Sequence, residues 1–225
     1  MKTNIKTPIK IAIVFVFMVG FITCRKDDNT NDNEPDIFYE TFTDKRDGQN
    51  YKYIQIGSQV WMAENLNFDT SYGSWIYDNK SSNALIYGRL YNWETACSVC
   101  PEGWHLPDRN EMSTLIKYLG GPAVAGGKMK RTGTAYWKAT NTGATNSSGF
   151  TALPGGIRYD SEGGWFDNIG EFGSFWTSSE YIVESTAVYV SITYNSGKVG
   201  SSFSDTNGLD WCNKYYALSI RCIKD

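Results

Sequence analysis

Residues 51–56 and 59–62 are two short runs of aromatic, β-branched and other apolar side chains interrupted by polar positions, the pattern of half-buried strands. Only Gly57-Ser58 separates the two runs. Glycine at the first position of a two-residue turn supplies the positive φ that a type II′ turn requires. The pattern therefore predicts a β-hairpin at the start of the folded region.

Two further stretches carry helical signals. A short helix is predicted from about Arg89 to Ala96. In the second stretch Asp108 can cap a helix, and Glu111 can reach back to that cap. The apolar positions that follow match one helical face: Met112, Leu115, Ile116 and Leu119. Gly120-Gly121 is expected to end this helix with a left-handed cap.

Beyond residue 125 the chain is rich in Gly, Ser, Thr and Asn, so long loops are expected between short strands. Aromatic strands are predicted at 164–166 and 175–177. A clearer strand at 187–192 is expected to turn at 195–197. The alternation over 216–222 predicts a last strand with one face in the core. The pattern as a whole predicts an α+β fold with two helices, mostly antiparallel short strands and long loops.

The N-terminus has the layout of a bacterial lipoprotein signal. Three lysines precede an apolar run at 11–22, which is shorter than the ~20 residues that span a bilayer comfortably. Thr23-Cys24 follows in a loose version of the small-residue cleavage box. We expect residues 1–23 to be a cleaved signal peptide and Cys24 to be lipidated, with each buried methylene contributing about 0.8 kcal/mol to anchoring. The alternative is an uncleaved anchor with an unmodified Cys24.

Residues 24–40 are expected to be a lipid-attached flexible tether, and residues 41–225 the folded domain. Arg25 to Asp28 resemble the basic-then-acidic tetrad of surface-exported lipoproteins of the Bacteroidetes, and 29–36 offer no apolar residue to bury except a proline. The expected location is the outer membrane, exposed at the cell surface and attached through lipid on Cys24.

The net charge of the chain without its leader limits the classes of binding partner that are expected. Without the leader, 18 basic residues stand against 24 acidic ones, a formal charge of −6, and the basic residues form no cluster. Nucleic acid is therefore not expected as a partner, nor is electrostatic binding to anionic lipid.

Four cysteines follow Cys24: Cys97, Cys100, Cys212 and Cys222. An even number in an oxidising compartment predicts two disulfides, and three pairings are possible. Zinc would need a second closely spaced pair, whereas nine residues separate Cys212 from Cys222 and no histidine is nearby. No metal or other cofactor is expected.

The chain has eight Trp and fifteen Tyr residues but a single His. Most such rings fill cores, but those among Gly, Ser and Asn are less readily buried. The candidate ligand-binding residues chosen on this ground are Trp137, Tyr159, Trp165, Phe166 and Trp211.

Six ordered blocks between residues 48 and 225 carry a family resemblance: 57–66, 87–93, 100–107, 153–158, 175–180 and 220–222. In order, they resemble the Fibrobacter succinogenes major paralogous domain. That family is similar in turn to the formylglycine-generating-enzyme branch of the C-type-lectin-like fold. The resemblance implies a single C-type-lectin-like domain with two helices and long loops, and a surface or secreted protein. It does not imply an enzyme.

Catalysis is not expected. The oxidase relatives place a reactive cysteine pair, four residues apart, before the closing Arg-Cys, whereas residues 198–203 contain no cysteine. His105 is the only imidazole and lies before a helix start, where a structural hydrogen bond is the favoured role. Glu64 and Glu180 recur in the blocks and are interpreted as caps or cross-links. Asp160, Glu162, Asp167 and Asn168 share a glycine-rich loop, but solvated loop polarity explains them as well as an ion does.

These observations favour a lipid-anchored, non-catalytic module that binds a glycan or an extracellular protein through its aromatic loops. Two alternatives stay open. A structural or fimbria-like component would self-associate through an exposed edge strand or apolar patch. A hydrolase would need a cleft with paired carboxylates.

Overall fold

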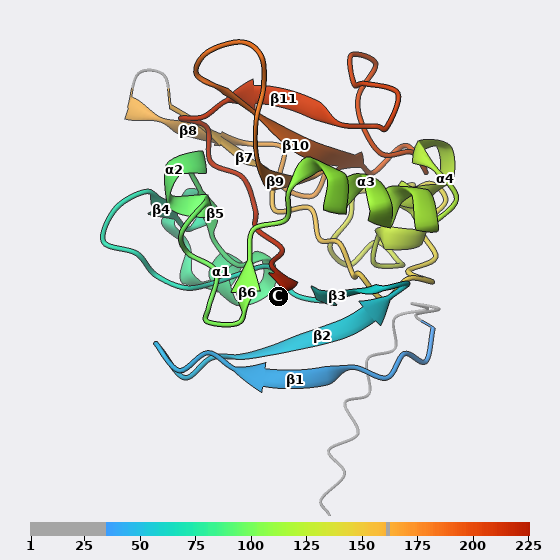
Figure 1. Ribbon diagram of the computed structural model, residues 1–225, viewed down its shortest axis with the longest axis horizontal. Coiled ribbons are helices and arrows are strands. Elements are labelled where there is room, and N and C mark those ends of the chain that lie inside the picture. Colours follow the sequence, from blue (N-terminus) through green and yellow to red (C-terminus); the bar gives the residue numbers. More distant parts are fainter. Residues whose placement is uncertain (1–34, 161–162) are drawn as a thin grey trace, which may run out of the picture.

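The computed structural model describes residues 35–160 and 163–225, so the leader, Cys24 and most of the tether lie outside the described residues. Figure 1 shows the following elements: β1 (Glu40–Thr43), β2 (Asn50–Ile56), β3 (Gln59–Met62), β4 (Ser74–Trp75), the 3-10 helix η1 (Tyr77–Asn79), α1 (Ser81–Tyr87), β5 (Leu90–Tyr91), α2 (Trp93–Ala96), β6 (Trp104–His105), α3 (Arg109–Tyr118), α4 (Pro122–Met129), β7 (Ile157–Tyr159), β8 (Trp165–Asp167), β9 (Phe172–Glu180), β10 (Thr186–Thr193), β11 (Asp210–Asn213) and β12 (Ile223–Lys224). The α+β class is therefore confirmed. None of the helices in the described part is long and apolar enough to cross a membrane.

The largest sheet joins the two ends of the folded region. Its strand order is β1-β2-β3-β12-β6, and all neighbours are antiparallel. The predicted hairpin is its centre, with Ile56 opposite Gln59 and Gly57 at φ 63°. Because β12 inserts between β3 and β6, the C-terminal segment closes the sheet that the hairpin begins (Figure 1).

A second sheet, β11-β10-β9, separates two hydrophobic clusters. Val188, Val190 and Ile192 of β10 point into the first cluster, and alternate residues Ala187 and Tyr189 contact the second. This alternation is the period of a strand buried on both faces. Two short ribbons, β4-β5 and β7-β8, form separate two-stranded sheets.

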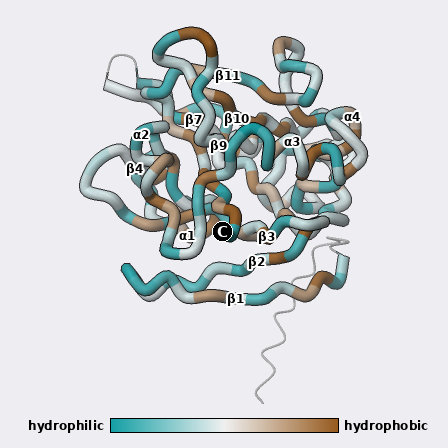
Figure 2. Tube along the Cα trace, in the orientation of Figure 1, coloured by the Kyte–Doolittle hydropathy of each residue, from teal (hydrophilic) through white to brown (hydrophobic). Residues whose placement is uncertain are grey.

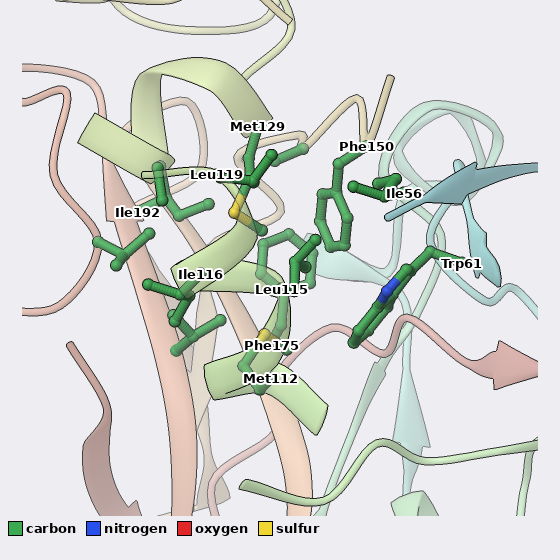
Figure 3. Close-up of a cluster of buried hydrophobic side chains, with 14 of the residues drawn as sticks. Ile56, Trp61, Met112, Leu115, Ile116, Leu119, Met129, Phe150, Phe175 and Ile192 are labelled. Carbon is green, nitrogen blue, oxygen red and sulfur yellow. The ribbon is translucent and has the colours of Figure 1, made fainter. Parts of the chain in front are cut away.

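The first cluster forms between α3, α4 and the two sheets. Figure 3 shows Met112, Leu115 and Ile116 of α3 facing Phe175 and Ile192, with Trp61 and Phe150 on the other side. The predicted capping box begins α3: Asp108 accepts from the amides of Asn110 (2.7 Å) and Glu111 (2.8 Å), and Glu111 accepts from the Asp108 amide (2.8 Å). Gly120 and Gly121, at φ 100° and 90°, end the helix as expected.

Two helices were not predicted. α1 has no buried residue and no side-chain cap, so its sequence lacks an amphipathic pattern. In α4, a Cβ atom on Gly126 would lie 2.2 Å from Lys198 O, and one on Gly127 would lie 2.2 Å from Gly143 O. These glycines allow close backbone packing, although glycine weakens a helix by itself.

Two other expectations were wrong in detail. The helix predicted at 89–96 is a strand, β5, followed by the four-residue helix α2. The segment 217–223 is buried on both faces, not on one, because isolated bridges join it to Tyr91, Arg158 and Phe175 on different sides. The predicted strand at 187–192 and its return are confirmed by β10 and the Ile192–Val199 bridge.

Candidate functional site

Two of the sequence blocks, 57–66 and 220–222, meet at a buried guanidinium. Arg221 is 0% exposed and stacks over Phe150, with 4.7 Å between Cζ and the ring centroid. Its Nε donates to Asn65 Oδ1 (2.7 Å), Nη1 donates to the carbonyls of Met62 (3.1 Å) and Phe150, and Nη2 donates to Thr151 O (2.8 Å). Burial lowers the pKa of Arg221 to about 9. Its role is to join the closing segment to the segment after β3 and to the loop before β7.

Other block residues also form internal links. Trp176 Nε1 donates to Tyr91 O (2.8 Å), and Trp93 Nε1 donates to Thr177 O (2.9 Å). The carboxylates expected to cross-link do so: Glu64 accepts from the Lys52 amide (2.8 Å), and Glu180 pairs with Lys214 (3.2 Å). The fold thus explains these block residues without a ligand.

The described cysteines form one disulfide, between Cys100 and Cys222, whose Cα atoms are 6.0 Å apart. The expectation of a second disulfide was wrong. Cys97 lies exposed at the end of α2, whereas Cys212 packs against the second hydrophobic cluster from β11. Burial raises the pKa of the Cys212 thiol, which disfavours thiolate chemistry there.

Trp137 is not available to a ligand, contrary to expectation. It is 1% exposed and belongs to the first hydrophobic cluster. Its Nε1 donates to Ala152 O (3.0 Å), which satisfies the polar edge of the ring inside the core. Gly173 contributes space, because a Cβ there would lie 3.3 Å from the indole.

Tyr159 and Trp165 lie together at the surface. They are register partners across β7 and β8, and their rings stack with centroids 5.0 Å apart at 27°. Tyr216 meets Tyr159 edge-on at 4.9 Å. Trp165 is 49% exposed, and burial raises the pKa of Tyr159. We call Tyr159, Trp165 and Tyr216 the aromatic platform.

The other two candidates lie elsewhere. Phe166 points to the opposite face of the β7-β8 ribbon, where it packs on Tyr77 at 5.1 Å. Trp211, 37% exposed, stacks flat on Tyr181, with centroids 4.3 Å apart at 2°. The adjoining turn between β9 and β10 is apolar (brown in Figure 2) yet exposed, with Ile182 91% exposed. The five candidates therefore form no single site.

Sequence reasoning missed Tyr216 and Tyr181, the ring partners of the exposed residues. A local signal existed for Tyr159 with Trp165, since two rings flank a short Gly- and Asp-containing turn. No local signal identifies Tyr216, which comes from a segment more than fifty positions later and was assigned to a regular strand.

His105 makes structural hydrogen bonds, the role that the sequence favoured. Its Nδ1 lies 2.6 Å from Asp225 Oδ1, and its Nε2 lies 3.0 Å from Glu111 Oε1. Burial opposes protonation, but hydrogen bonds to the two carboxylates and their charges outweigh it and raise the pKa of His105. The imidazole joins α3 to the C-terminal segment.

No group of three or more His, Cys, Asp or Glu side chains able to hold a metal ion occurs among the described residues. Of the loop residues considered for an ion, Glu162 lies outside the described part. Asp160 lies 3.5 Å from Arg158 Nη1, and Asp167 accepts from the Asn168 amide (2.8 Å).

The chain matches the family model of the Fibrobacter succinogenes major domain over residues 54–224. The match covers most of the chain, so the protein belongs to this family. Neither the curated proteins nor the solved structures contain a match.

Proposed function

We propose that this member of the Fibrobacter succinogenes major domain family is a lipid-anchored surface protein of Bacteroidetes type that binds a glycan without catalysis. The single observation that carries the binding proposal is the aromatic platform. A half-exposed indole stacked at 27° on a second ring offers a flat apolar face of the kind on which a sugar ring stacks.

The platform is ordered before a ligand arrives. Tyr159 packs between Trp165 and Tyr216, so its ring is held from two sides. A Cβ on Gly164 would lie 2.0 Å from Arg158 Nη2, which shows how closely the Gly164 backbone approaches that guanidinium. Rigid side chains lose little entropy on binding, so such an arrangement favours affinity.

Membrane attachment rests on the sequence. The basic leader, the apolar run and Cys24 support export and lipidation, and the tetrad Arg25 to Asp28 supports display outside the cell. Protease treatment of intact cells, followed by detection of the chain, tests the outward location. A chain that is cleaved only after the cells are lysed would contradict it.

The binding proposal is tested with the full-length chain purified in detergent on an array of glycans and extracellular matrix proteins, with and without calcium. Trp165→Ala is compared with Trp211→Ala as the matched control, because both indoles are partly exposed and each stacks on one tyrosine. We expect Trp165→Ala to weaken saturable binding about tenfold or more, since covering a large exposed ring is worth roughly 1.5–3 kcal/mol. Trp211→Ala should leave binding unchanged.

Other outcomes are informative. Equal loss in both variants with an unchanged melting temperature would contradict the platform as the site. Binding only to extracellular proteins would replace the glycan by a protein ligand. Self-association without any ligand would favour the structural alternative, for which the exposed edge strand β1 offers a pairing surface.

A further inference from the structure

The aromatic platform has an acidic side chain on its own face. In the β7-β8 ribbon Tyr159 lies opposite Trp165, and Ile157 lies opposite Asp167. Alternate residues of a strand point to the same side of a sheet, so Asp167 lies on the face that carries both rings, with its Cα ~6.5 Å from that of Trp165. The Asp167 side chain is exposed. A carboxylate therefore borders the ring face that is proposed to contact a sugar.

Asp167 has acceptor capacity that the fold does not use. Its Oδ1 accepts from the Asn168 amide (2.8 Å). Among the described residues, none donates to its Oδ2 and none forms an ion pair with it. An ionised carboxylate can accept about four hydrogen bonds and donates none. Asp167 can therefore accept hydrogen bonds from a ligand on the platform.

The charge of Asp167 acts at the rings themselves. Burial is the main cause of the raised pKa of Tyr159, and the negative charge of Asp167 raises that pKa further. A negative potential disfavours a phenolate at Tyr159, and the same potential attracts a cation to this face.

The basic side chains nearest to the platform in sequence contact other groups. Arg158 points to the opposite face of the ribbon, where its Cζ lies 4.2 Å from the Trp75 ring centroid. Lys214 belongs to the segment that supplies Tyr216, but its ammonium lies 3.2 Å from Glu180 Oε2. Neither cation is placed to neutralise the carboxylate beside the platform.

The exposed ring favours a cation as well. Trp165 is 49% exposed, and an indole is the aromatic side chain whose face attracts an ammonium group most strongly. The same flat face accommodates the apolar side of a pyranose ring. A sugar that carries a positive charge would use both properties of the indole and the charge of Asp167.

We propose that the platform binds a glycan of amino sugars, one whose pyranose units carry free, protonated amines. This inference rests on the proposed function and names the ligand class of the same site. A pyranose ring covers the Trp165 indole, and its ammonium donates to Asp167 Oδ2. A neutral sugar keeps the stacking contact but lacks the attraction between the charges.

The test uses the full-length chain in detergent and calorimetric titration with the β-1,4-linked tetramers of glucosamine, N-acetylglucosamine and glucose. These tetramers share one backbone and differ at C2, which carries an ammonium, an acetamide or a hydroxyl group when the pH is below the pKa of the sugar amine. Asp167→Asn is compared with Glu184→Gln, which removes an exposed carboxylate from the turn between β9 and β10.

We expect the glucosamine tetramer to bind about tenfold more tightly than the glucose and N-acetylglucosamine tetramers, since an ion pair and a cation–π contact are added at an exposed site. Asp167→Asn should reduce this preference at least about threefold, whereas Glu184→Gln should leave it unchanged. Added salt should reduce the preference, because it screens exposed charges. Trp165→Ala should weaken the binding of every tetramer that binds.

The inference is overturned if a neutral tetramer binds as tightly as the glucosamine tetramer, or if Asp167→Asn keeps the full preference. In that case glycan binding through Trp165 still stands, whereas the absence of binding to any glycan overturns the proposed function as well. Tighter binding of tetralysine than of the glucosamine tetramer would also overturn the inference, because the occupant would then be a basic peptide. Should Asp167→Asn fail to fold, the three tetramers on the original chain decide the matter.

Discussion

Lys130 offers the sharpest test of how the loops are held. Its side chain is 0% exposed at the end of α4, and its ammonium donates to the carbonyls of Thr142 (2.9 Å), Thr193 (3.0 Å) and Ser196 (2.9 Å). It also lies 5.4 Å from the centroid of the buried Trp137 ring. Burial lowers the pKa of Lys130 to about 8, so the group is mostly protonated at pH 7. Carbonyl oxygens surround the ammonium, as they would surround a bound cation.

Replacing Lys130 by Met keeps the length of the side chain and removes the hydrogen bonds of the ammonium. A buried acceptor left without its donor costs about 1–3 kcal/mol, and burying the thioether methyl offsets part of that cost. We expect the free energy of unfolding to fall by about 3–5 kcal/mol. Lys117→Met on the exposed face of α3 is the control and should change it by less than about 0.5 kcal/mol.

The measurement is urea unfolding of the full-length chain, followed by tryptophan fluorescence and far-ultraviolet circular dichroism. A second arm uses Lys130→Ala, which leaves a cavity among the same carbonyls. Methylammonium should restore part of the lost stability, whereas tetramethylammonium, which cannot donate a hydrogen bond, should not. A loss below about 1 kcal/mol for Lys130→Met, or equal rescue by both ions, would refute the reasoning.

Three further predictions concern the links between segments. Arg221→Lys keeps the positive charge but loses the planar guanidinium with its several N–H donors, so the free energy of unfolding should fall by about 3–5 kcal/mol. A loss below about 1 kcal/mol in urea unfolding would contradict the role of the guanidinium. The raised pKa of His105 predicts a contribution to stability that is complete below about pH 6.5 and is lost as pH rises through the raised pKa. Nuclear magnetic resonance titration of the ring measures the pKa, and the pH profile of stability in His105→Gln measures the contribution. A lowered pKa would exclude this contribution. Replacing Cys100 and Cys222 together by serine should cost about 2–5 kcal/mol, because the bridge closes a separation of 122 residues; thermal unfolding under non-reducing conditions measures it, and an unchanged melting temperature would oppose it.

The elements predicted correctly from the sequence are those fixed by short-range chemistry. The first hairpin depends on Gly57 between two apolar runs, and α3 depends on Asp108 with Glu111 three residues later. Each signal lies within a few positions and acts the same way in any surroundings. α1 offered no such signal because its residues are not buried, and its start has no side-chain cap.

The errors share a different cause, since they concern side chains whose environment is assembled from distant segments. Trp137 was placed at the surface because its neighbours are small and polar, yet the Ala152 carbonyl accepts from its indole inside the core. The strand predicted over 216–222 had only one face in the core, yet Arg221 within it is buried and donates to carbonyl oxygens of two distant segments. The alternation of apolar and polar residues along a chain cannot show which polar side chains will find hydrogen-bond partners inside the folded core.

Burial and internal hydrogen bonds also distinguish the tryptophans that stabilise the fold from Trp165, the one proposed to bind a glycan. Trp176 is 0% exposed and donates to Tyr91 O, whereas Trp165 is 49% exposed and lies outside the sequence blocks. Alanine at Trp176 should lower the free energy of unfolding by about 3–5 kcal/mol, as for other buried aromatic side chains. Alanine at Trp165 should cost about 1 kcal/mol or less, because it loses mainly one ring stack. Urea unfolding of both variants decides the matter: if Trp165→Ala destabilises the domain as much as Trp176→Ala, the indole is part of the core and the platform is not a binding surface.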